Sequence, residues 1–284
     1  MFIIIGILVV FGSVGGGFVL SKGQLIALWQ PFELLVIGGA AFGAFLISNP
    51  VKVIKASFAS IPTAIKGSPY KKAIYLDLLN LMFDIFNKIR KDGTMSIESD
   101  IDEPESSELF NKYPNIMKNH HAMDFICDYM RLMVSGNMNA FEVEALMDVE
   151  LQTHHQESAL AADAITKVSD ALPGFGIVAA VLGIVITMAS LGGPPEEIGA
   201  HVAAALVGTF LGILLAYGFV GPLANSLEHL AREEGKFIEC IKTCIMATLN
   251  GYTPQVAVEF GRKVMYSTER PSFSELEEHI KNNK

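Results

Sequence analysis

The sequence predicts an all-α polytopic membrane protein with four transmembrane helices and a large helical cytoplasmic domain. Residues 171–224 contain two apolar runs joined by the polar turn Gly192–Gly199. Each run has about 20 residues, the length that crosses roughly 30 Å of hydrocarbon as an α-helix. Two more apolar runs lie within residues 1–50. Hydrophobic residues make up 51% of the 284 residues, yet 18% are charged, which indicates spans combined with long water-exposed segments.

The first two spans are expected at residues 1–20 and 32–48. The first run has no basic start and no convincing cleavage site, so we interpret it as a retained helix and not as a signal peptide. Trp29 lies between the two runs as an interfacial anchor, and Asn49-Pro50 ends the second run. Residues 1–50 thus form the first predicted domain.

The third and fourth spans lie in residues 171–224, which form a further predicted domain. Neither apolar run contains Asp, Glu, Lys or Arg, whereas small residues recur at Gly176, Gly183, Gly208 and Gly212. Such residues allow close helix contact in membranes, so we expect a partner helix to lie on this face. Counting residues along the two antiparallel runs places Ala180 and Thr209 near the middle of the bilayer. Thr209 is the polar residue at that depth.

Each of these spans carries one proline, Pro173 or Pro222. Because the spans are antiparallel, the two prolines should lie near the same membrane face. The spacing favours a helix start at Pro173 and a helix end at Pro222. The alternative is a paired hinge, since proline removes a backbone hydrogen bond and loosens a helix.

The distribution of basic residues predicts that both termini are cytoplasmic. The connection 21–31 holds one lysine and the turn 192–199 holds acids, whereas the opposite ends are flanked by Lys52, Lys55, Lys66, Lys71, Lys72, Lys167 and Arg232. Residues 51–170 are then a cytoplasmic helical domain, and residues 225–284 are a cytoplasmic C-terminal helical segment. We therefore expect a multi-pass membrane protein.

Helical periodicity dominates the two cytoplasmic segments. We expect helices at residues 73–90, 122–135, 141–152, 227–249 and 271–280. Asn139 and Ser272 are suitable N-caps, and the fourth span is expected to continue, or nearly so, into 227–249. Residues 96–107 form a short acidic stretch, and no β pattern of useful length occurs.

The residues exclude most chemistry within the chain. No span has a central acid or base, so an ion pathway would need a carboxylate from a partner helix. No phosphate-binding or nucleophile motif is present, which argues against an enzyme. The net charge of −9 argues against nucleic-acid binding. His120-His121, His154-His155 and the cysteine pair Cys240 and Cys244 lack a metal-binding frame, so we expect no metal and no cofactor.

One charged group remains as a candidate site. It consists of Arg90, Lys91, Asp92, Glu98, Asp100, Asp102, Glu103 and Glu105. Spacing alone favours a solvated loop. The alternative is an electrostatic docking surface for a charged cytoplasmic partner.

Five long motifs resemble the MotA family of flagellar motor stator subunits, which belongs to the MotA/TolQ/ExbB proton channels. They are RKDGTMSIESDI from Arg90, MDFICDYMRLMVSGNMNAFEVEALMD from Met123, LPGFGIVAAVLGIV from Leu172, VGTFLGILLAYGF from Val207 and NGYTPQVAVEFGRKVMYSTERPSF from Asn250. The resemblance implies a ring of five such subunits around two copies of a MotB-like single-span partner that carries the ion-binding aspartate. It also implies contact with the rotor switch-complex protein FliG and a location in the bacterial inner (cytoplasmic) membrane.

The resemblance also implies roles for single residues. Arg90 and Glu98 match the pair that meets charged residues of the rotor. Pro173 and Pro222 match the prolines that couple ion passage to movement, while Ala180 and Thr209 match ion-path positions. Sodium-driven relatives have a threonine at the position of Ala180 and a hydroxyl at that of Gly208, so H⁺ is the expected coupling ion.

Three other readings stay open at this point. The chain could be a sodium-driven stator subunit, or an ExbB/TolQ-like subunit that energises outer-membrane processes. It could also be a non-conducting membrane scaffold whose cytoplasmic helices recruit partners. The four spans and the segment from Arg90 weigh against the ExbB/TolQ-like reading. The paired prolines and Thr209 weigh against the scaffold.

Overall fold

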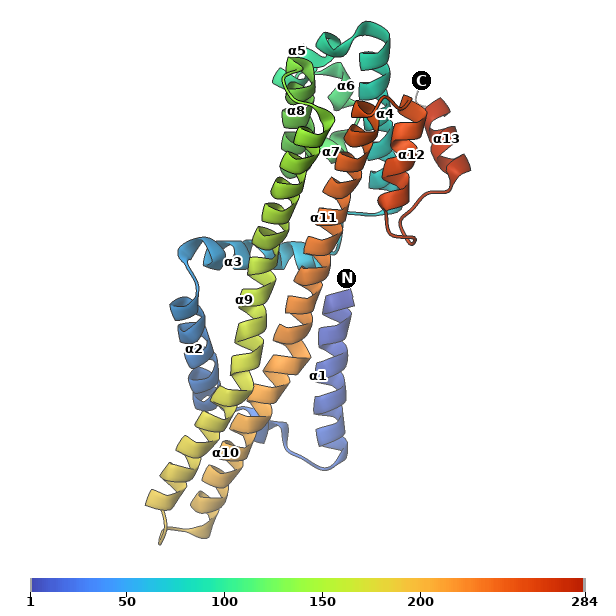
Figure 1. The fold of residues 1–284 in the computed structure, drawn as a ribbon. Helices are drawn as coiled ribbons and strands as arrows, with labels where there is room; N and C mark the ends of the chain where they lie inside the picture. Colours follow the sequence, from blue (N-terminus) through green and yellow to red (C-terminus); the bar gives the residue numbers. More distant parts are fainter. Residues whose placement is uncertain (1, 283–284) are drawn as a thin grey trace. The chain divides into compact units, whose positions relative to one another are not determined.

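A computed structural model describes residues 2–282, which are helical with no strand among them (Figure 1). This confirms the predicted fold class. Met1, the first residue of the first predicted span, lies outside the described residues. Contacts divide the chain into two compact units, Met1–Gly67 with Glu157–Leu230 (unit 1) and Ser68–Gln156 with Ala231–Lys284 (unit 2).

Within residues 2–282, four helices are long and apolar enough to cross a membrane, as predicted. They begin with α1 (Phe2–Leu20) and α2 (Pro31–Ser48), which are separated by the 3-10 turn η1 (Leu25–Leu28). Asn49 is extended and ends α2 as expected. The third is α9 (Ala140–Ala189) and the fourth is α10 (Pro195–Leu215), which continues through the π-helical turn η3 (Ala216–Val220) into α11 (Gly221–Leu249).

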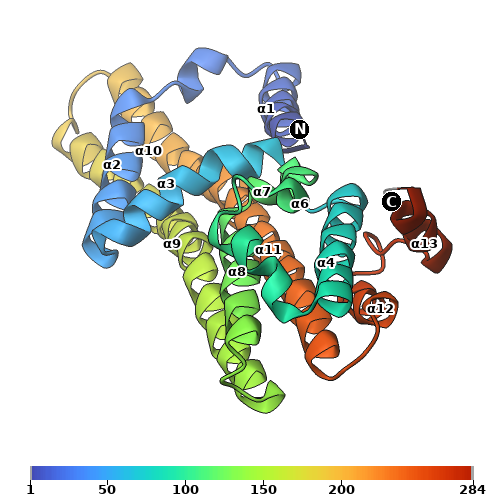
Figure 2. The same ribbon diagram turned by 90° about the horizontal axis from the view of Figure 1, so that it is seen from above.

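Unit 1 is built around the membrane part of α9. Ile37 and Ala41 of α2 are buried in one cluster with Leu172 and Ala179 of α9. On another side, Phe11 of α1 contacts Phe219 of η3, with ring centroids 4.8 Å apart. Helix α3 (Val51–Lys66) runs across the direction of α2 (Figures 1 and 2) and contributes Ala64 to a second buried cluster.

Unit 2 is organised around α4 (Lys72–Asp92), whose predicted apolar stripe is buried. Helices α6 (Glu108–Asn111), α7 (Pro114–Met117), α12 (Pro254–Val264) and α13 (Phe273–Asn282) pack against α4. Beyond α4 come the 3-10 turn η2 (Thr94–Ile97), α5 (Glu98–Asp102) and α8 (His120–Ser135). Gly93 ends α4 at φ +87°, where residues with a side chain are strained.

Both predicted N-caps form reciprocal capping boxes. Asn139 Oδ1 accepts the Glu142 N–H at 3.0 Å, and Glu142 Oε2 accepts the Asn139 N–H at 2.9 Å. Ser272 and Glu275 make the same pair of bonds, at 3.2 and 2.6 Å. Because these bonds satisfy N–H groups that a helix start leaves free, they fix where α9 and α13 begin.

The main difference from the prediction is the length of α9. A separate helix at 141–152 was expected, but α9 runs without a break for 50 residues, from Ala140 to Ala189. Four helices, α3, α6, α7 and α12, were not predicted, and α6 and α7 have only four residues each. The two longer ones each hold a residue typical of turns, Pro62 in α3 and Gly261 in α12. Packing overrides these local signals: Gly261, for instance, lies against the Cys244 side chain, where a Cβ would collide with the sulfur.

Candidate functional site

The membrane hairpin is held by an unusually close approach of α9 and α10. A Cβ added to Gly212 would lie 2.7 Å from the Leu172 carbonyl oxygen and 2.9 Å from the Gly176 Cα. A Cβ added to Gly183 would lie 2.8 Å from the Ala205 Cβ. The two helices therefore meet backbone to backbone at Gly176 and Gly212.

This contact corrects one expectation. The small-residue stripe was assigned to a partner helix, but its glycines bring the two arms of the hairpin together. Small residues permit this because two backbones can then pack without intervening side chains. A partner helix would have to contact other residues of α9 and α10.

The two predicted ion-path positions lie at one level of the hairpin. The Cβ position of Gly208 is 3.3 Å from the Ala179 Cβ and 3.5 Å from the Ala180 nitrogen, and Thr209 follows Gly208. Both Ala180 and Thr209 are half-buried. This level is where α10 crosses the middle part of the apolar run of α9.

The Thr209 hydroxyl differs from the other threonine hydroxyls of the hairpin region. Thr187 donates to the Gly183 carbonyl at 2.8 Å, and Thr166 donates to the Ala162 carbonyl at 3.0 Å. Thr209 makes no such bond within residues 2–282. Its hydroxyl is therefore available to water or to a partner, in contrast to the usual bond to the helix's own carbonyl.

One polar residue at this level escaped the sequence analysis. Glu33 lies in the first turn of α2, and its Oε2 is 3.0 Å from the Cβ position of Gly208. A single acid at the start of an apolar run resembles an interfacial residue, which is why its significance was missed. The position of Glu33 becomes notable only when α2 is known to pack against the hairpin. That packing is a feature of the tertiary structure and has no local sequence signal.

Neither predicted coupling proline marks the end of a helix. Pro173 lies inside α9, and Pro222 is the second residue of α11, directly after η3. The favoured reading, a helix start and a helix end, is therefore wrong. Helices continue through a proline when a local π turn and neighbouring side chains satisfy the freed backbone groups.

A hydrogen bond joins the two proline regions. Ser169, one turn before Pro173, is buried and donates its hydroxyl to the Ala216 carbonyl oxygen at 3.0 Å. The same carbonyl accepts the Gly221 N–H that closes η3, just before Pro222. This hydrogen bond thus joins the turn of α9 before Pro173 to the π-helical turn between α10 and α11.

The predicted rotor-facing pair lies in unit 2. Arg90 is in the last turn of α4 and Glu98 begins α5, and both side chains are exposed. Neither has an ion-pair or hydrogen-bond partner within residues 2–282. Both charges are therefore available to another protein.

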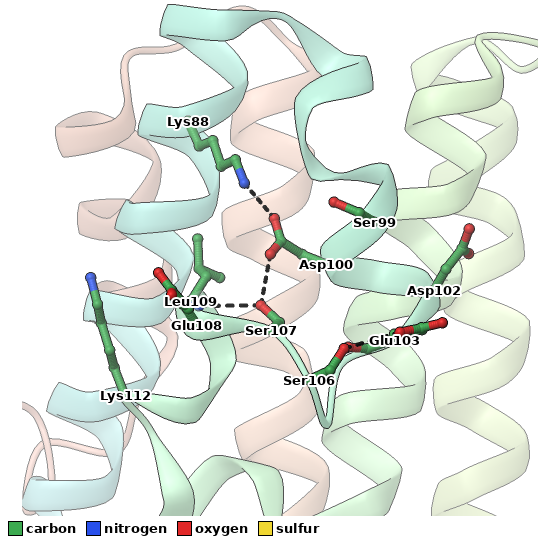
Figure 3. Close-up of a pocket in the computed structure, with 10 residues that line it drawn as sticks. All are labelled: Lys88, Ser99, Asp100, Asp102, Glu103, Ser106, Ser107, Glu108, Leu109 and Lys112. Atoms are coloured by element: carbon green, nitrogen blue, oxygen red, sulfur yellow. Dashed lines mark hydrogen bonds and ion pairs between the residues drawn. The ribbon is translucent and has the colours of Figure 1, made fainter.

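Other charges of the same segment are occupied internally (Figure 3). Lys88 Nζ contacts Asp100 Oδ2 at 2.6 Å, and Asp100 Oδ1 accepts the Ser107 hydroxyl at 2.7 Å. The Ser107 oxygen in turn caps α6 by accepting the Leu109 and Phe110 N–H groups. On the other side, Arg131 binds Asp102 at 3.2 Å and the Ile101 carbonyl at 2.7 Å. These bonds hold α5 against the neighbouring helices, while Glu98 at its start stays exposed.

Comparisons with known proteins place the chain in one family. Residues 4–93 match the model described as Motility protein A N-terminal, and residues 118–239 match the MotA/TolQ/ExbB proton channel family. The chain is 51% identical over 281 residues to Motility protein A of Salmonella typhimurium, covering 99% of this chain and 95% of that protein. It is 36% identical to Chemotaxis protein LafT of Vibrio parahaemolyticus, covering 97% of each.

Solved structures share the fold. The MotAB structure from C. jejuni superimposes with a TM-score of 0.78 at 20% identity, covering 95% of this chain and 98% of that one. The flagellar MotAB stator complex from Bacillus subtilis gives 0.66 at 23% identity, covering 90% and 92%. The chain therefore belongs to the MotA/TolQ/ExbB proton channel family, as a flagellar stator subunit of the motility protein A type.

Proposed function

We propose that this chain, together with a MotB-like single-span partner, forms a proton channel that converts inward proton flow into torque on the rotor. The observation that carries the proposal is that the apolar runs of residues 171–224 contain no Asp, Glu, Lys or Arg. These two runs can line a proton path but offer no carboxylate that could take up a proton. The partner supplies the aspartate that does so.

The free Thr209 hydroxyl supports an ion path at its level. Protons moving inward gain about 2.3 kcal/mol per 100 mV of membrane potential. In the proposed sequence they reach the partner's aspartate beside Ala180 and Thr209 and neutralise it. Glu33 adds a second carboxylate at this level, on the side of α2.

The lack of hydroxyl groups at Ala180 and Gly208 supports proton coupling. Sodium needs several oxygen ligands to replace its water shell, whereas a proton can pass through water to a carboxylate. Ala180 and Gly208, which lie against each other, offer no hydroxyl where sodium-driven relatives have one. Sodium coupling is the alternative that this pair disfavours.

Movement is proposed to pass from the ion path to the rotor through the helices. Neutralising the aspartate changes the fit of the partner helix, and a ring of five chains steps around two partner helices. The step passes through Pro173, Pro222 and the Ser169–Ala216 bond to Arg90 and Glu98, which push on FliG. This arrangement requires both termini on the cytoplasmic side of the inner membrane.

Swimming speed tests the coupling ion. Cells that depend on this chain for motility are observed in sodium-free medium, with and without a protonophore. The proposal expects normal speed without sodium and arrest on adding the protonophore. Arrest on removing sodium, with no effect of the protonophore, would overturn proton coupling.

A further inference from the structure

Three side chains from three helices of unit 2 converge outside the regions described so far. They are His121 of α8, His154 of α9 and Glu234 of α11. His121 Nδ1 lies 2.9 Å from Glu234 Oε1, His154 Nε2 lies 3.6 Å from the same oxygen, and the two nitrogens are 3.4 Å apart. Three potential ligand atoms thus form a nearly equilateral triangle.

The triangle has the dimensions of one face of a tetrahedral metal site. Zinc binds histidine nitrogen and carboxylate oxygen at about 2.0–2.1 Å, so neighbouring ligand atoms of a tetrahedral site are about 3.3–3.4 Å apart. The three measured separations bracket this value. A bound ion would replace the hydrogen bonds that now join these atoms.

The surroundings favour a bound cation over a chance cluster. The side chains of His154 and Glu234 are 18% and 22% exposed, so both are held between helices, whereas His121 covers them from outside at 65%. Packing therefore positions two of the three donor atoms before any ion binds.

A small cavity adjoins the two imidazoles. His121 and His154 line a cavity of 150 Å³ together with Asp124, which lies on α8 one turn after His121. The cavity has room for water, and Asp124 offers a carboxylate at its wall. Two imidazoles, one carboxylate and a water or second carboxylate form a donor set suited to zinc and similar borderline ions.

We propose that His121, His154 and Glu234 bind one divalent cation of the Zn²⁺ class per chain, with Asp124 or water in the fourth position. The proposal does not depend on the proposed function. Ligation would displace the proton that either imidazole shares with Glu234. The bound ion would also join α8 to α9 and α11. Without the ion, these helices are joined at this point by hydrogen bonds among the two imidazoles and the carboxylate.

The neighbouring histidines provide matched controls. His120 and His155 each precede or follow a proposed ligand by one residue, and both are exposed and outside the cluster. A general affinity of surface histidines for zinc would involve all four residues. A built site involves one histidine from each pair.

The experiment uses the full chain with its partner in detergent, stripped with EDTA and then titrated with Zn²⁺. The wild type and the double variant His120→Ala/His155→Ala are expected to bind one ion per chain. His121→Ala, His154→Ala and Glu234→Gln should each weaken binding by at least about 100-fold, because even residues that only support a ligand cost 10- to 100-fold. Thermal unfolding in EDTA checks that the variants are folded.

Two further results decide the matter. Co²⁺ should give the intense visible absorption of four-coordinate cobalt in the wild type and in His120→Ala/His155→Ala, and should lose it in His121→Ala. His121 is mostly exposed, so its removal leaves the core intact. Equal loss in the control double variant, or no saturable binding by the wild type, would overturn the proposal.

Discussion

The Ser169 hydroxyl donates a hydrogen bond of 3.0 Å to the Ala216 carbonyl oxygen, across the two arms of the membrane hairpin. Ser169 lies one turn before Pro173, and Ala216 begins the π-helical turn that precedes Pro222. The bond therefore connects the two places where a helical hydrogen bond is missing. A movement that bends one helix here has to strain or break this bond.

Replacing Ser169 by alanine should uncouple the two proline regions. We expect slower swimming at an unchanged amount of membrane-inserted chain, together with a loss of about 1 kcal/mol of stability, the usual net value of one hydrogen bond. Thr166→Ala is the control, because its hydroxyl bonds within its own helix. Equal speeds for Ser169→Ala and the wild type would argue against the coupling role.

The backbone contact at Gly212 predicts a large effect from one methyl group. In Gly212→Ala the new Cβ would lie 2.7 Å from the Leu172 carbonyl oxygen, so α9 and α10 must separate. We expect a destabilisation of about 1–3 kcal/mol or more, typical of overpacking. The measurement is thermal unfolding of the purified stator complex.

Gly174→Ala is the matched control for this contact. Gly174 lies on α9, the helix that Gly212 of α10 contacts, and a Cβ added to Gly174 would meet no atom within 4 Å among residues 2–282. Its stability should stay equal or rise slightly, since alanine favours helix over glycine. Similar losses in both variants would show that the contact is not specific.

Charge reversal at the rotor-facing residues should reduce torque without unfolding unit 2. Arg90→Glu or Glu98→Lys alone should slow swimming mildly, because single exposed charges contribute little, and the double variant should slow it strongly. The thermal stability of all three should match the wild type, since neither residue has an ion-pair or hydrogen-bond partner in the described part of the chain. Full motility of the double variant would contradict the docking role.

Two variants separate docking from folding in this test. Lys118→Glu reverses an exposed charge near Pro69 and Lys71, which precede α4, whereas Arg90 lies in the last turn of α4. Motility should therefore persist in Lys118→Glu. Asp100→Asn weakens the internal contacts to Lys88 and Ser107 and should lower thermal stability as well as motility.

The Glu259–Arg262 pair of α12 predicts a pH effect on stability. Two bonds of 2.6 Å from the buried Arg262 guanidinium lower the pKa of Glu259 from its ordinary value of 4.5. A lowered pKa in the folded state means that the stabilisation is present above about pH 4.5 and is lost as the pH falls through the lower value. Glu259→Gln should therefore cost about 1 kcal/mol at neutral pH.

Unfolding curves between neutral and acidic pH check this expectation. The difference between wild type and Glu259→Gln should be constant above pH 4.5 and should shrink below it. A difference that grows with acidity would have the wrong sign for this pair.

Features that depend on local residue order could be predicted from the sequence. The four apolar spans follow from hydropathy, and the capping boxes at Asn139 and Ser272 follow from residue types three positions apart. The end of α2 at Asn49 follows from Pro50. In each case the interacting groups are close in the chain.

Features that depend on which helices meet could not be predicted. Pro173 has the local signature of a helix start, but α9 continues through it. Glu33 gains its significance from packing against Gly208, 175 positions later in the numbering (208 − 33). Two histidines that are adjacent in a helix point in different directions, which argues against a metal site within one pair. His121 and His154 come from different pairs on different helices, and only the tertiary structure shows that they meet.

The central claim is that this chain forms the wall of a proton path whose carboxylate belongs to another protein. Proton uptake into vesicles tests it most directly, with the chain alone compared with the chain plus a MotB-like partner freed of its plug. The account predicts uptake with the partner, none without it, and none when the partner's aspartate is replaced by asparagine. Full-rate uptake by the chain alone would contradict the account and would point to Glu33 as the carrier.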